Sequence, residues 1–92
     1  MYKATIAVTL HPSILDPQGK TVHHALGNLG HHSVHRVRMG KHAELWIDED
    51  SEEAARRVAE EACDTLIANP VTENYAIELE AVAPEDVPAD AA

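Results

Sequence analysis

The sequence has few of the residues that build a large core or carry redox chemistry. Its 92 residues include no phenylalanine, one tryptophan, two tyrosines and one cysteine, whereas fifteen are alanine. A single cysteine, Cys63, cannot form an internal disulfide and excludes zinc sites built on several cysteines. A chain of this size and composition has one domain with a thin core, and we expect it to associate with another chain.

Basic residues are also scarce, with seven Lys and Arg against sixteen Asp and Glu, and the net charge is −9. A field of this sign repels phosphate backbones and anionic lipids, so we expect neither nucleic acid nor a membrane as a partner. Residues 1–10 lack the pattern of a signal peptide, and no apolar run reaches the length of about 18 residues needed to span a membrane. We expect a cytoplasmic protein, where a lone thiol stays reduced.

The first 30 residues predict a strand followed by a helix. Apolar and polar residues alternate over 2–10, as in a half-buried strand. A helix is predicted over 17–29, because Asp16 suits an N-cap, Pro17 suits the first helical position and Gly30 suits the stop.

Residues 34–48 predict a hairpin of two further strands, with its turn at Gly40-Lys41. A two-residue loop would set the apolar Val37 against Glu44. A three-residue loop is preferred, because it pairs Val37 with Leu45 on one face and, on the other, Arg38 with Glu44 and Arg36 with Trp46.

The rest of the chain predicts a second helix and a last strand. Asp50 or Ser51 suits the N-cap of a helix over 52–68, which Asn69-Pro70 ends, and alternation over 75–81 predicts the strand. The apolar stripe expected along the helix comprises Ala55, Val58, Ala59, Ala62 and Leu66.

The predicted order is β-α-β-β-α-β, an α+β fold of the ferredoxin-like type. It implies a four-stranded antiparallel sheet with both helices on one face. The other face carries Trp46 and would be open, so we expect the chain to oligomerise through it. Residues 1–81 form the single predicted domain, and the acidic tail over 82–92 is expected to be disordered.

No set of side chains in the sequence predicts a catalytic or metal site. Seven histidines are present, but none forms an i, i+4 pair on a helix, so surface histidine is favoured over a histidine-rich metal site. No serine stands in a nucleophile-elbow context, and Cys63 lies in an alanine-rich helix, where a packed residue is favoured over a reactive thiol.

Two segments contain more polar and charged residues than a simple turn requires. Residues 15–20 place a capped helix start beside Lys20, and residues 36–41 hold three of the seven basic residues. They predict either a helix cap and a charged outer strand, or a docking surface for an acidic patch of a partner.

Several separated motifs resemble one known family. The strings LDPQGK at 15–20, VRMGK at 37–41, LIANPV at 66–71 and ENY at 73–75 resemble the PurS family, the small subunit of phosphoribosylformylglycinamidine (FGAM) synthase. The resemblance covers residues 2–81. The histidine-rich stretch at 31–35 and the acidic tail depart from the family pattern.

The resemblance implies a role in purine biosynthesis. The complex converts formylglycinamide ribonucleotide to its amidine with ATP, magnesium and ammonia from glutamine. A PurL-type synthetase subunit binds ATP and magnesium, a PurQ-type glutaminase subunit releases ammonia, and PurS self-associates and joins both without catalytic residues or a cofactor of its own.

The same resemblance and the two polar segments mark the residues expected at partner interfaces. They are Asp16, Pro17, Gln18, Gly19, Lys20, Arg36, Arg38, Gly40, Lys41, Trp46, Asn69 and Pro70. The alternative function is a free-standing regulatory module that binds a small ligand at a dimer interface, which rests on fold analogy alone.

Overall fold

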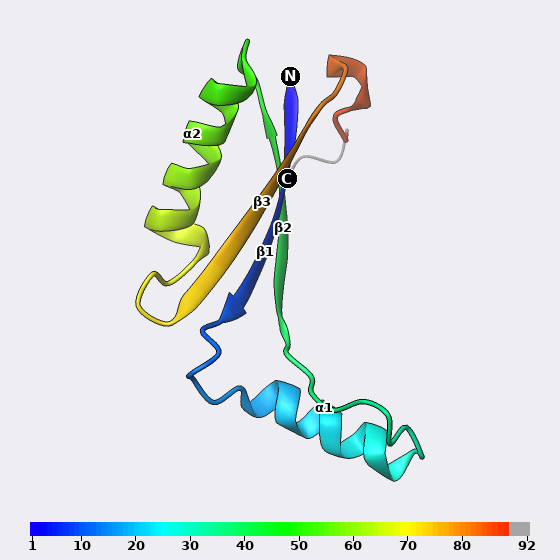
Figure 1. The fold of residues 1–92 in the computed structure, drawn as a ribbon. Helices are drawn as coiled ribbons and strands as arrows, with labels where there is room; N and C mark the ends of the chain where they lie inside the picture. Colours follow the sequence, from blue (N-terminus) through cyan, green and yellow to red (C-terminus); the bar gives the residue numbers. More distant parts are fainter. Residues whose placement is uncertain (89–92) are drawn as a thin grey trace.

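The computed structural model describes residues 1–88, which form an α+β fold. The elements are β1 (Tyr2–Leu10), α1 (Pro17–Asn28), β2 (Gly40–Ile47), α2 (Glu52–Ala62) and β3 (Glu73–Ala81). A π-helical turn over Cys63–Ile67 continues α2, and a 3-10 turn over Pro84–Asp86 follows β3 (Figure 1). Residues 89–92, the end of the acidic tail, lie outside the described residues.

The three strands form an antiparallel sheet in the order β2-β1-β3. Ile6 in the central strand lies opposite Ala43 of β2 and Ile77 of β3, so the three side chains share one face. That face is the inner one, because Ala4, Ile6 and Val8 are almost fully buried. The alternating pattern over 2–10 therefore predicted the inner face correctly.

Helix α2 covers the inner face of the sheet (Figure 1). Ser51 Oγ caps it by accepting from Ala54 N at 3.1 Å. Ala55, Ala59 and Cys63 are fully buried against the sheet, and their small side chains let the helix backbone lie close to the strands. The predicted apolar stripe is wrong at two positions. Val58 is 41% exposed, because the buried line of the helix runs through Ala55, Ala59 and Cys63. Leu66 is 86% exposed, because the π-helical turn shifts the register of the last turn.

The expected four-stranded sheet is not confirmed, since the structure has three strands and residues 34–39 belong to none of them. The predicted hairpin is absent because β2 pairs directly with β1, which sets Leu45 opposite Ala4. Gly40 already lies opposite Thr9, one residue from the end of β1, so the chain before Gly40 has run past the strand it could pair with.

The expectation that both helices cover one face is wrong for α1. This helix extends beyond one end of the sheet (Figure 1), and within residues 1–88 it has no contact with a strand comparable to that of α2. Residues 34–39 run beside it, where His23 Nε2 hydrogen-bonds to Val34 O at 2.8 Å. We call residues 11–39, which leave the sheet and return to it, the arm. None of the helices described is long and apolar enough to cross a membrane.

Candidate functional site

The motif residues meet where the arm leaves the sheet. Asp16 Oδ1 accepts from Gly19 N at 2.9 Å, which caps α1, and Asp16 Oδ2 accepts from Met39 N at 2.8 Å. These backbone donors hold the pKa of Asp16 below its ordinary value, Gly19 contributing more than Met39. One carboxylate therefore joins the start of the helix to the residue before β2.

Gly19 allows this close approach. A Cβ at this position would lie 2.5 Å from Asp16 Oδ2 and 2.5 Å from the backbone oxygen of Val37. Gly40 is restricted in a similar way, because a Cβ there would overlap the backbone oxygen of Val8. Both glycines of the predicted interface are thus explained by packing between backbone segments.

Arg38 ties the arm to the end of β1. Its Nη2 donates to Thr9 Oγ1 at 3.0 Å and also to the backbone oxygen of Leu10. Arg36, two residues earlier, is exposed. The sequence predicted Arg36 and Arg38 as equivalent strand residues. In the structure, Arg38 hydrogen-bonds to the end of β1, whereas Arg36 is available to a partner.

The turn before β3 reaches the same end of the sheet. Asn69 Oδ1 accepts from Val71 N at 3.0 Å, and Asn69 N donates to Glu73 Oε1 at 2.7 Å. Glu73 Oε1 also lies 3.9 Å from Lys41 Nζ. Asn69 and Pro70 therefore shape a turn that meets the start of β2 through Glu73.

Motifs far apart in the sequence thus converge in one place, which we call the junction. Its residues are Asp16, Gly19, Arg38, Gly40, Lys41, Asn69, Pro70 and Glu73. The interface prediction did not include Glu73, although it stands in the ENY motif at 73–75. Its link to Lys41 joins residues 32 positions apart, and only the fold brings these two together.

Trp46 lies apart from the junction, on the open face of the sheet. Lys3 Nζ sits 5.6 Å from the centre of its ring and 2.9 Å from Glu44 Oε2. The hydrogen bond between Lys3 and Glu44 raises the pKa of Lys3 and lowers the pKa of Glu44. Trp46 is only half-buried, so its ring remains partly available to another molecule.

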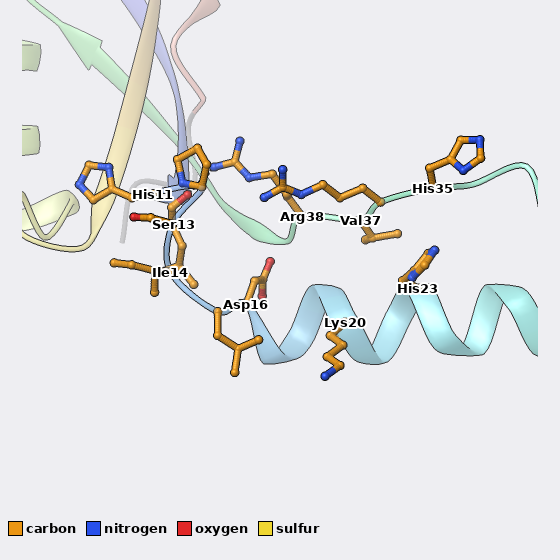
Figure 2. Close-up of a pocket in the computed structure, with 13 residues that line it drawn as sticks. His11, Ser13, Ile14, Asp16, Lys20, His23, His35, Val37 and Arg38 are labelled. Carbon is orange, nitrogen blue, oxygen red and sulfur yellow. Dashed lines mark hydrogen bonds between the residues drawn. The ribbon is translucent and has the colours of Figure 1, made fainter.

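The described residues do not assemble a reactive centre. Among residues 1–88, no group of three or more His, Cys, Asp or Glu is placed to hold a metal ion. Burial raises the pKa of the Cys63 thiol and so favours the unreactive form. Ser51 Oγ is used as a helix cap. A groove of about 470 Å³ lies beside the junction, between the loop after β1, the start of α1 and residues 35–38 (Figure 2). A second hollow of about 580 Å³ lies farther along the arm, among its histidines.

Known proteins agree with this architecture. The family model described as "PurS: Phosphoribosylformylglycinamidine (FGAM) synthase" matches residues 3–81. The PurS subunit of the synthase from Bacillus subtilis is 44% identical over 82 residues, which are 89% of this chain and 96% of that one. The PurS subunit from Synechocystis is 43% identical, with 88% of this chain and 81% of that one covered.

Solved structures show the same likeness. The crystal structure of PurS from Methanocaldococcus jannaschii has a TM-score of 0.81 at 37% identity, covering 90% of this chain and all of that one. A chain of the PurLQS structure from Thermotoga maritima has a TM-score of 0.80 at 29% identity, covering 86% of this chain and 96% of that one. The chain therefore belongs to the PurS family, the small subunit of FGAM synthase in purine biosynthesis.

Proposed function

We propose that this chain is the non-catalytic assembly subunit of its FGAM synthase, acting in the cytoplasm. The proposal rests on what the motif residues do in the structure. They form the hydrogen bonds of the junction, which hold the arm against the end of the sheet. Among residues 1–88 they do not converge on a reactive group. ATP and magnesium would then be bound by the synthetase subunit. A rigid link between synthetase and glutaminase would support the transfer of ammonia, which is lost to protonation in water.

The junction and the arm are the proposed contact with a PurL-type synthetase subunit. The arm projects from the body of the chain (Figure 1), and its exposed residues include Leu15, Lys20 and Arg36. The Thermotoga maritima relative occurs in a structure named PurLQS, which supports PurL-type and PurQ-type partners for this chain. A free-standing regulatory module is not favoured, because the relatives from Synechocystis and Bacillus subtilis are named as synthase subunits.

Self-pairing through the open sheet face is the second proposed contact. The face opposite α2 carries the exposed Ala7 and Ala76 in its middle, and Trp46 toward one end, opposite Lys3. Leu29, the C-cap residue of α1, is 74% exposed within residues 1–88. A second copy would let the two uncovered surfaces bury each other.

Reconstitution tests the assembly role. The three subunits are purified separately, and amidine formation is assayed with glutamine, with this chain present, omitted and added back. We expect glutamine-dependent activity to be lost on omission and restored on addition, with the glutaminase and synthetase proteins otherwise unchanged. Full activity without this chain would refute the proposal.

A further inference from the structure

We infer that the groove between α1 and residues 35–38 is the docking site for an acidic segment of the synthetase subunit. This inference rests on the proposed function and names the chemistry of one of its contacts. It comes from the distribution of charge, which the fold divides sharply between the arm and the rest of the chain.

The arm is basic in a strongly acidic protein. Residues 11–39 hold three Lys or Arg, six of the seven histidines and one acid, Asp16. The other 63 residues hold four Lys or Arg and fifteen acids. The arm therefore has a net charge of +2 and the remainder −11, counted with neutral histidine. An acidic partner would be drawn to the arm and repelled by the body, which orients the encounter.

All three basic residues of the arm line the groove. Lys20, Arg36 and Arg38 lie along it, with His23 and His35 beside them. In Figure 2, Asp16 and His23 point from the helix toward the neighbouring segment, Arg38 reaches toward the end of β1, and the Lys20 ammonium lies on the other side of the helix. Within residues 1–88, no carboxylate lies within 4.0 Å of these three cations, whereas Lys3, Lys41 and Arg57 each have an acidic partner. Lys20 and Arg36 are exposed and therefore open to carboxylates of a partner. Arg56 on α2 also has no ion pair among the described residues, so it is the position of these cations along one groove that distinguishes the arm.

The lining favours a peptide segment over a phosphate group. Apolar residues, among them Ile14, Leu15 and Val37, alternate with the cations and offer contacts to apolar side chains. Asp16 remains charged inside the groove. Its carboxylate would repel a phosphate group, which concentrates two negative charges, more strongly than it would repel single carboxylates spaced along a peptide. An extended polyanion such as nucleic acid would also meet the acidic body of the chain.

Charge reversal at one exposed position tests the site. Arg36→Glu replaces an exposed groove cation that forms no hydrogen bond or ion pair within residues 1–88, and Arg57→Glu makes the same change at an exposed arginine of α2 that pairs only with Glu53. Affinity of the full-length chain for the purified synthetase subunit is measured by calorimetry, with thermal melts as the folding control. We expect Arg36→Glu to weaken binding by about tenfold or more, and Arg57→Glu by less than about twofold. Equal effects of the two variants would overturn the inference.

Cross-linking identifies the occupant. A carbodiimide joins Lys20 Nζ to a carboxylate in contact with it through an amide bond, and mass spectrometry then locates the bond in the assembled complex. We expect Lys20 to couple to an Asp or Glu of the synthetase, and the Lys20→Arg variant to lose that product. Coupling of Lys20 only to the glutaminase or to a second copy would overturn the inference. Absence of any synthetase binding would instead remove the proposed function itself.

Discussion

Two glycines of α1 are expected to respond in opposite ways to alanine. A Cβ on Gly27 meets no atom within 4 Å, whereas one on Gly19 meets Asp16 and the backbone of Val37 at 2.5 Å. Because alanine is the better helix former, Gly27→Ala should raise the free energy of unfolding by about 0.5–1 kcal/mol. Gly19→Ala should lower it by about 1–3 kcal/mol, since a backbone segment must move. Urea denaturation of both variants measures this, and a stabilised Gly19→Ala would contradict the geometry of the junction.

Asp16 should make the junction sensitive to acid. Its pKa is lowered in the folded protein by the Gly19 and Met39 amides, so its stabilising effect is fully present above its ordinary value of 3.8. That effect is lost as the pH falls through the lower pKa of the folded state. Thermal melts of wild type and Asp16→Asn should therefore differ more at pH 7 than at pH 3. A difference that stays constant with pH would exclude this role of the charge.

At the scale of the element, the π-helical turn that continues α2 is a place where the helical period of apolar residues predicts burial wrongly. Leu66 occupies an apolar position of the helical pattern but is 86% exposed, whereas Ile6 in the central strand is fully buried. Leu66→Ala should change the free energy of unfolding by no more than about 0.5 kcal/mol. Ile6→Ala should lower it by about 2–5 kcal/mol, because it leaves a cavity under α2. Chemical denaturation compares them, and similar losses would show that Leu66 is covered in solution, as by a second copy.

The arm is the element that sequence patterns predicted least well. Apolar and polar residues alternate around Val37 as regularly as in a strand, and Gly40 is a residue typical of hairpin turns. A strand, however, also needs a neighbour, and β1 ends at Leu10, opposite Glu73 of β3. Residues 34–39 instead bond to the side chains of His23 and Asp16. The N-cap at Asp16 was predicted correctly because it depends on four consecutive residues, whereas its bond to Met39 depends on the fold.

At the scale of the whole molecule, self-pairing should be separable from folding. Ala7 and Ala81 are both exposed alanines of the sheet, but Ala7 lies on the open face and Ala81 shares the face of Tyr2. Ala7→Glu should place a charge in the proposed contact and shift the mass measured by light scattering toward the 10.0 kDa of a single chain. Ala81→Glu serves as the matched control and should leave the mass unchanged. A mass that Ala7→Glu does not alter would move the contact away from this face.

The sequence by itself determined the class of fold, the inner face of β1, the N-cap of α1 at Asp16 and the family, and it narrowed the N-cap of α2 to Asp50 or Ser51. These depend on neighbouring residues, on the period of apolar positions and on motifs read in order. Only the tertiary structure decided that α1 leaves the sheet, that Glu73 meets Lys41 and that the three cations of the arm line one groove. Those outcomes depend on which distant backbone segment competes for each hydrogen bond and each apolar surface, and no local pattern in the sequence records that competition.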